Sequence, residues 1–471
     1  MLGGLKAAAQ GAAAESVFLW LLLAALAWVP FLYGSNVLVA WGINAVLFPG
    51  LAGVYEVSLL LRGKRHPVGI NRLTMPAVLF AGVVAWIFVQ NASWVPTSLT
   101  NPIWGMAAKA LRSPIQGSIS VNRDLTSLAL LRLVTAASVF WLALQLSWDG
   151  AHAQKLMVAI ALIGAVYALY GLVAMKTGQP PWLAIRMADG EVRATFVDPD
   201  SYASYAGIGL IAASGLLLQL YRHDNRAPVR WQSRLASFIE TTGQRGALLL
   251  ACGFTILAAL LLTGSRGGVI ATGIGFVVLG LLRPRWDRHQ RSLWPLTLAC
   301  VTLTMALLAF GEVLVGKIEG SGLYDPNRMA VYILTLRSIH DLPLVGYGYG
   351  TFRDVFPMFR DRSLSLWGFW AQAHNTYLEV FQGLGVVFGA ALILCVLLLV
   401  LRCAKGALGR HQNATIPRVA ASAACLVGAH ALVDFSLQMQ AVAITLMAVL
   451  GAGVAQSEST SSSRMTRLTG P

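Results

Sequence analysis

Ala373-His374-Asn375-Thr376-Tyr377-Leu378-Glu379 stands where the longest polar segment of this sequence, Lys317 to Asn375, meets a long apolar run. The polar segment is rich in arginine and could not lie in lipid, and it brings His374 to the mouth of the next apolar helix. A polar loop of this size, followed by a histidine that enters an apolar helix, is typical of the working surface of a membrane enzyme. We therefore interpret the rest of the chain as scaffold for this loop.

The composition indicates an integral membrane protein. The 471 residues are 56% apolar and 12% charged, whereas soluble domains carry about 25% charged residues. A net charge of +15 would suggest nucleic acid as the partner of a soluble chain. Here the basic residues concentrate in short loops on one side of the membrane, so we expect no nucleic acid. The five cysteines lie in or beside apolar runs without metal spacing, and we expect no disulfide.

Apolar runs long enough to cross about 30 Å of hydrocarbon predict an all-α protein. We expect about twelve transmembrane helices, at 16–33, 37–61, 75–94, 127–148, 155–176, 202–221, 246–263, 267–282, 293–315, 376–401, 417–436 and 438–455. The glycines and the charge in the sequence Thr263-Gly264-Ser265-Arg266-Gly267-Gly268 predict a break between the seventh and eighth helices. The large loop 317–375 would join the ninth and tenth helices.

The distribution of Lys and Arg predicts the orientation. With both termini in the cytoplasm, the short inner loops collect most of the 35 basic residues. We expect residues 1–456 to form one polytopic membrane domain, loop 317–375 included, and residues 457–471 to be a disordered cytoplasmic tail. In this orientation Arg193, Arg266 and His374 face the far, periplasm-like side, together with Asp198 and Asp200.

Three arginines are candidates for anion binding. The turn before the eighth helix exposes backbone N–H groups beside Arg266, which suits a phosphate; the alternative is a snorkelling arginine in a tight turn. Arg328 follows the turn residues Asp325-Pro326-Asn327 and is either a solvated charge or a substrate contact. Arg193 is either a second phosphate ligand or part of an interfacial loop.

The histidine at the loop's end has two interpretations. A neutral imidazole at His374 could take a proton from a hydroxyl, whereas a lone histidine at an interface is often a cap or packing residue. Asn375 and Thr376 are plausible caps for the helix that follows. The glycine-rich stretch 345–350 lacks the dinucleotide-binding spacing, and we expect a flexible turn there.

Polar residues also occur within the predicted spans. Arg132 lies within a predicted membrane span, where a charge is energetically costly, so it should have a partner or a substrate. His430 and Asp434 are spaced i, i+4 in the eleventh predicted helix, and we favour a structural pair between them.

The sequence shows no Walker loop, acidic metal cluster, zinc spacing or soluble domain for a nucleotide sugar. We therefore expect no cofactor and no metal. A far-side enzyme has no ATP or nucleotide sugar at hand, so its donor must arrive already activated. A lipid-borne pyrophosphate fits this requirement, and arginines fit its charge.

Together these residues resemble the bacterial O-antigen ligase and O-antigen/exopolysaccharide polymerase superfamily, which includes protein O-oligosaccharyltransferases. The resemblance covers roughly residues 190–440. It lies in Ser265-Arg266-Gly267-Gly268, in Arg328 with the Leu342-Pro343-Leu344-Val345-Gly346-Tyr347-Gly348 turn, and in Ala373-His374-Asn375-x-x-Leu378 with Gly383-Leu384-Gly385.

The resemblance implies a glycosyltransferase of the bacterial inner membrane that acts on the periplasmic side. It would move a glycan from undecaprenyl pyrophosphate to an acceptor hydroxyl without a metal. Arg266 and Arg328 would hold the pyrophosphate and stabilise it as a leaving group, with Arg193 as a helper. His374 would orient or deprotonate the acceptor hydroxyl, and Asn375 would join the substrate-binding residues.

Several alternatives remain open at the level of sequence. A ligase would use a lipid A-core sugar as acceptor, a polymerase another lipid-linked repeat, and a protein glycosyltransferase a protein. A transporter or flippase of lipid-linked or anionic glycans is the alternative from another class. Transporters are typically built from repeated halves with functional groups near the bilayer midplane. We find no internal repeat, and the polar groups gather on one face, so we favour the enzyme.

Overall fold

A computed structural model describes residues 2–178, 191–224, 243–283, 326–365, 368–410 and 414–468. Within these ranges all regular structure is helical, and no strand occurs. The prediction of an all-α protein is confirmed for this part of the chain.

Seven helical segments are long and apolar enough to cross a membrane, and three shorter apolar helices accompany them among the described residues. The seven segments are α2 (Leu38–Leu61), η1 with α3 (Ile70–Leu73, Thr74–Asn91), α5 (Arg123–Leu146), α6 (Gly150–Thr177), α7 (Pro199–Asp224), α14 (Thr376–Gly409) and α16 (Gln440–Leu468). The shorter ones are α1 (Leu2–Trp28, apolar from Ala14), α9 (Gln244–Leu261) and α10 (Arg266–Leu281). The remaining helices include α4 (Pro102–Leu111), α12 (Pro326–Asp341), α13 (Phe352–Phe359) and α15 (Thr415–His430).

Helices occur at eleven of the twelve predicted runs. The run 293–315 lies outside the described residues, so the number of membrane crossings stays a prediction. The predicted break between the seventh and eighth runs is confirmed, because α9 ends at Leu261 and α10 begins at Arg266. α16 continues through Leu468, so it includes most of the segment for which the sequence predicts a disordered tail.

The centre of the bundle is formed by α7 and α16, the two most buried of the long helices. α15 packs against both, and α16 also packs along α5. Small residues permit this close approach: a Cβ atom at Gly451 would lie 2.5 Å from the carbonyl oxygen of Phe140. Such contacts are the usual means of helix association in lipid, where burial of apolar surface provides no force between helices.

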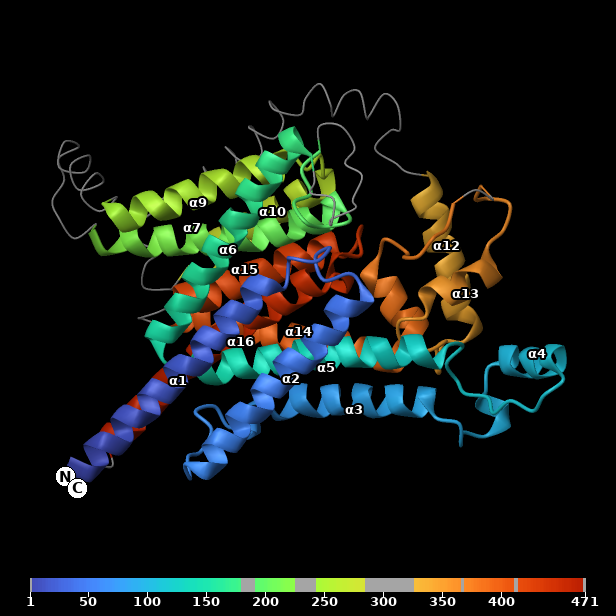
Figure 1. Ribbon diagram of the computed structural model, residues 1–471, viewed down its shortest axis with the longest axis horizontal. Coiled ribbons are helices and arrows are strands. Elements are labelled where there is room, and N and C mark those ends of the chain that lie inside the picture. The colour runs from blue at the N-terminus through green and yellow to red at the C-terminus, as the bar shows by residue number, and fades with distance from the viewer. Residues whose placement is uncertain are drawn as a thin grey trace.

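One end of the bundle carries additional structure (Figure 1). α12 and α13 lie there, opposite the end at which α1 starts and α16 finishes. The described part of the predicted loop 317–375 therefore contains two helices, which enclose a small core of their own. That core consists of Val331, Leu334, Phe352, Phe356, Leu364 and Ala373.

The turn predicted at residues 345–350 is present, and its backbone is hydrogen-bonded to α14. The backbone N–H groups of Tyr347 and Gly348 donate to the carbonyl oxygens of Gln382 and Gly383, each at 3.0 Å. α14 is interrupted beside this turn at Gly385, whose φ is 76°. The reason is the absence of side chains: glycine lets the backbone of the turn reach the backbone of α14. We call residues 342–351 the glycine turn.

Candidate functional site

His374 is positioned by contacts with α12, with the residues that precede it and with the residues after α15. Its φ of 54° is in the left-handed region, which is uncommon for residues other than glycine and is found more often at functional sites than elsewhere. The Tyr332 hydroxyl donates to its carbonyl oxygen at 2.9 Å. Its ring meets the rings of Trp370 and Phe435 edge to face, at 5.7 and 4.9 Å between centroids. Its Nδ1 atom lies 3.9 Å from Oδ1 of Asp434.

Asn375 fixes the start of α14 immediately after this histidine. Its side-chain oxygen accepts from the N–H of Leu378 at 3.1 Å, which confirms the predicted cap. Its amide nitrogen donates to the carbonyl oxygen of Leu432 at 2.9 Å. The N–H of Thr376 donates to Ala431 at 2.9 Å. These bonds tie His374 to residues 431–439, which we call the α15–α16 segment.

Arg328 reaches the same segment from α12. Its Nη1 atom donates to the carbonyl oxygen of Val433 at 3.0 Å. Its Nη2 atom lies 3.6 Å from Oδ2 of Asp200, at the start of α7. The α15–α16 segment thus contacts both Arg328 and His374.

Arg266 is the first residue of α10, as the sequence predicts. Ser265 caps this helix by accepting from the N–H of Gly268 at 3.0 Å. The next residue, Gly267, faces the α15–α16 region: a Cβ atom there would lie 2.9 Å from Nε2 of His430 and 3.3 Å from a methyl group of Val433. The first turn of α10 therefore borders the residue that Arg328 binds.

Arg193 is nearby but has its own counter-charge. The N–H of Val192 donates to the carbonyl oxygen of Leu262 at 2.8 Å, so this loop runs beside the α9–α10 turn. Arg193 itself lies 3.3 Å from the Glu191 carboxylate and donates to the Val197 carbonyl oxygen at 3.2 Å. The fold brings Arg193 to the same end of the bundle, with its guanidinium engaged within its own loop.

Three carboxylates gather at this end, although the sequence spacing shows no acidic cluster. Oxygen atoms of Asp198, Asp200 and Asp434 lie within 4.8 Å of one another, an arrangement that could hold a metal ion. Ser201 donates to Asp198 through its N–H at 2.8 Å, and its hydroxyl lies 3.4 Å from Asp434. Arg328 supplies positive charge beside Asp200.

The environment of the cluster changes its acidity. Burial, together with the neighbouring carboxylates of Asp434 and Asp200, raises the pKa of Asp198 to about 7. Burial and the charge of Asp200 also raise the pKa of Asp434. Close like charges in a partly dry site cannot all ionise easily, so the cluster retains proton-binding capacity near neutral pH.

The predicted helical pair of His430 and Asp434 is wrong in its geometry. α15 ends at His430, so Asp434 lies in the α15–α16 segment and not one helical turn further along. The Ser436 hydroxyl joins them: it donates to the Asp434 carboxylate and lies 3.3 Å from Nδ1 of His430. The Ser204 hydroxyl contacts the same Nδ1 atom at 2.6 Å.

The partner predicted for Arg132 is present. Its guanidinium donates to the backbone carbonyl oxygen of Gln438 and lies 4.6 Å from the centre of the Trp41 ring.

Sequence reasoning missed Glu379, which accepts from the N–H of Ala373 at 2.5 Å and from the side chain of Gln438. A carboxylate within a predicted membrane span is the signal that could have indicated it.

These observations define a polytopic helical membrane protein with arginines, a histidine of positive φ and a cluster of partly buried carboxylates at one end of its bundle. Residues 251–394 match the family model described as O-antigen ligase. This region contains Arg266 and its turn, Arg328 with the glycine turn, and the His374 motif, so the match supports the resemblance to the O-antigen ligase/polymerase superfamily. None of the curated proteins matches the chain.

Proposed function

We propose that this protein is a glycosyltransferase that transfers a glycan from undecaprenyl pyrophosphate to an acceptor hydroxyl on the periplasmic side of the bacterial inner membrane. One observation carries the proposal: residues from distant parts of the chain converge on the α15–α16 segment. Arg328 binds Val433, the first turn of α10 after Arg266 borders Val433, and His374 faces Asp434. The family match over this region supports the same reaction class.

The arginines act on the donor. Transfer breaks the bond between the anomeric carbon and a phosphate oxygen, and the pyrophosphate departs with added negative charge. Arg266 and Arg328 bind that pyrophosphate and stabilise the charge that develops on it. Arg328 now contacts Asp200 and the Val433 carbonyl oxygen. Arg193 is a helper in the same region, and its charge is partly balanced by Glu191.

His374 acts on the acceptor. Its imidazole takes the proton of the acceptor hydroxyl as the oxygen attacks the anomeric carbon. The resulting imidazolium is stabilised by the Asp434 carboxylate, 3.9 Å away. Asn375 contributes by fixing the start of α14 and hence the position of the histidine. In this scheme the positive charge of the arginines performs the task that a metal ion performs in other transferases.

The identity of the acceptor determines which kind of glycosyltransferase this protein is. The sugar of a lipid A-core, another lipid-linked repeat, or a protein would define a ligase, a polymerase or a protein glycosyltransferase. Transport of a lipid-linked glycan remains the alternative from another class. The gathering of polar groups at one end of the bundle favours the enzyme, since transporters place theirs near the midplane.

A complementation experiment tests the proposal. A strain that lacks the gene receives the wild type, His374→Ala, Arg328→Gln or Arg337→Gln, and its surface glycans are compared by gel. Arg337 is the matched control, because it lies on the same helix but pairs with Asp361 and is 61% exposed. We expect the wild type and Arg337→Gln to restore the glycan and the other two variants to fail at equal abundance in the membrane.

The glycans of the deletion strain identify the acceptor. Single repeats on the lipid A-core indicate a polymerase, and polymer that accumulates on the carrier lipid indicates a ligase. Full restoration by His374→Ala contradicts the mechanism. Purified protein in detergent micelles, where no compartment exists, must still form the covalent product; solute movement without such a product would favour transport.

A further inference from the structure

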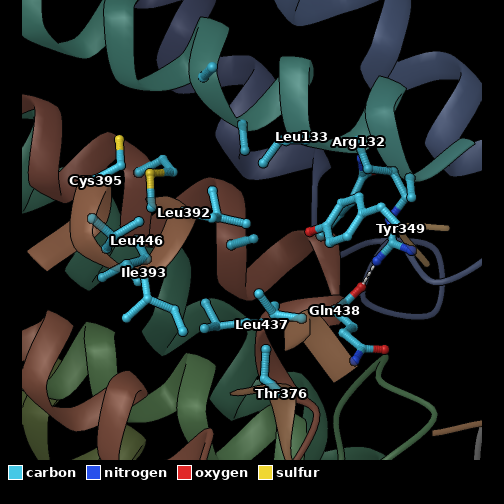
Figure 2. Close-up of a pocket in the computed structure, with 18 of the residues that line it drawn as sticks. Arg132, Leu133, Tyr349, Thr376, Leu392, Ile393, Cys395, Leu437, Gln438 and Leu446 are labelled. Atoms are coloured by element: carbon cyan, nitrogen blue, oxygen red, sulfur yellow. Dashed lines mark hydrogen bonds between the residues drawn. The ribbon is translucent and has the colours of Figure 1, made fainter. Parts of the chain in front are cut away.

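A large cavity lies among α3, α5, α14 and α16, apart from the arginines of the proposed donor site. Its volume is about 1000 Å³, at the upper end of the roughly 300–1000 Å³ that ligand pockets occupy. Most of its wall is apolar, and its polar side chains gather at one end (Figure 2). Figure 2 shows Arg132, Tyr349 and Gln438 at that end, and Leu392, Ile393 and Leu446 away from it. This is the shape of a site for an amphiphile.

The polar end of the cavity contains a buried hydrogen-bond donor without a described partner. Arg132 stacks on Trp41 and donates to Gln438. Its Nε atom is buried and has no hydrogen-bond partner among the residues that the structure describes. A cation on a membrane helix is energetically costly, and a buried donor atom without a partner adds to that cost. An oxygen atom from a bound head group would satisfy that donor.

The cavity extends to residues that lie beside His374 in the chain. Gln372 and Thr376, which flank His374 in sequence, are part of its wall. A chain of hydrogen bonds runs from Arg132 through Gln438 to Glu379, and Glu379 accepts from the N–H of Ala373. A molecule in the cavity would therefore place its head group beside the backbone that positions His374.

The arginines of the proposed donor site are separate from the cavity wall. The residues that line the cavity do not include Arg193, Arg266 or Arg328 in the part of the chain that the structure describes. Those arginines belong to the helices α10 and α12 and to the loop before α7, whereas the cavity lies among α3, α5 and α14. In a direct displacement the attacking oxygen and the leaving group lie on opposite faces of the anomeric carbon, as in inverting glycosidases.

We propose that the cavity holds the hydrocarbon of the acceptor lipid and presents its sugar hydroxyl to His374; this inference rests on the proposed glycosyltransferase function. The apolar wall buries the lipid chain, and Arg132 binds an oxygen of the head group. Acceptors with a long hydrocarbon are thereby selected over soluble sugars.

Filling the cavity tests this assignment. Ala136 lines it on α5, whereas Ala390 is exposed on the outer face of α14 and is not part of its wall. Purified wild type, Ala136→Leu, Ala136→Phe and Ala390→Phe are assayed with the lipid-linked donor and two acceptors from the same strain. One acceptor is intact and the other has had its lipid removed by hydrolysis. KM and kcat are measured for the donor and for each acceptor.

We expect Ala136→Phe to raise KM for the intact acceptor at least about tenfold, the effect of roughly two lost buried methylene groups. Ala136→Leu should give a smaller rise in the same direction. KM for the donor and for the lipid-free acceptor should stay at the wild-type value in all variants, and Ala390→Phe should match the wild type throughout.

The other outcomes overturn the inference in distinct ways. A rise in donor KM with an unchanged acceptor KM would assign the cavity to the donor chain. Equal losses with both acceptors would show damage to the fold and no lipid site. Unchanged kinetics in Ala136→Phe would show that the cavity takes no substrate. A wild type without glycan transfer would refute the proposed function itself, which separates the two failures.

Discussion

Replacing Gly346 by alanine should destabilise the protein through the glycine turn. Gly346 has a φ of 67°, and a Cβ atom there would lie 2.4 Å from the carbonyl oxygen of Gly383 and 2.6 Å from the nitrogen of Gly385. The left-handed conformation costs a residue with a Cβ atom about 1–2 kcal/mol. Overpacking against backbone adds about 1–3 kcal/mol. We therefore expect the free energy of unfolding to fall by about 2–5 kcal/mol.

Gly63 provides a control that separates the two contributions. Its φ of 59° is close to that of Gly346, but a Cβ atom there would meet nothing within 4 Å. Gly63→Ala should cost only the conformational part, about 1–2 kcal/mol. Denaturant titration of both variants in the same mixed micelles measures the difference, provided that the slopes agree with that of the wild type.

The result bears on the site as well as on stability. The glycine turn follows α12, which carries Arg328, and is hydrogen-bonded to α14, which begins after His374, so its displacement should also lower glycan transfer per folded molecule. If Gly346→Ala loses no more stability than Gly63→Ala, the packing of this turn against α14 is not as described.

Three further predictions concern the cap, the carboxylates and metal ions. Asn375→Ala should lose about 1 kcal/mol of stability with the helix cap, and Asn375→Asp should keep most of it; equal losses in thermal unfolding would contradict the cap. The pKa of Asp198 is raised from 3.8 to about 7, so its contribution to stability is full at low pH and is lost as the pH rises through about 7. The melting temperature of the wild type should accordingly fall between pH 5 and pH 8, and that of Asp198→Asn should fall less over the same range. Identical pH profiles of the two proteins would refute the raised pKa. EDTA should leave glycan transfer by the purified protein unchanged; loss of activity that Mg²⁺ restores would instead assign Asp198, Asp200 and Asp434 as a metal site.

Patterns that depend on neighbours in the chain were predicted well. Apolar runs placed helices at eleven positions, and the polar break at Gly264 placed the start of α10. The cap of α14 by Asn375 was predictable because it involves only the backbone N–H of Leu378, three residues further along the chain. Arg132 was expected to have a partner, since an arginine within a membrane span must be compensated.

Contacts between distant residues were not predictable in this way. The turn at 345–350 is predictable from its glycines, but its hydrogen bonds to the backbone of α14 are not, because nothing local indicates that α14 lies against it. The spacing of His430 and Asp434 suggested a helical pair, but the helix ends between them. Asp434 joins Asp198 and Asp200 only after folding.

The sequence by itself therefore determined the class of the protein: a helical membrane chain with basic loops, a polar segment rich in arginine, and a histidine at the entrance to a helix. Hydropathy, charge and capping are local, and they are readable one segment at a time. Which polar groups meet depends on how the helices pack. The α15–α16 segment brings Arg328, Asp434 and His374 together, and helices from distant parts of the chain enclose a cavity whose wall includes the neighbours Gln372 and Thr376 of the same histidine. Neither is encoded in any one stretch, because each depends on how separate helices pack.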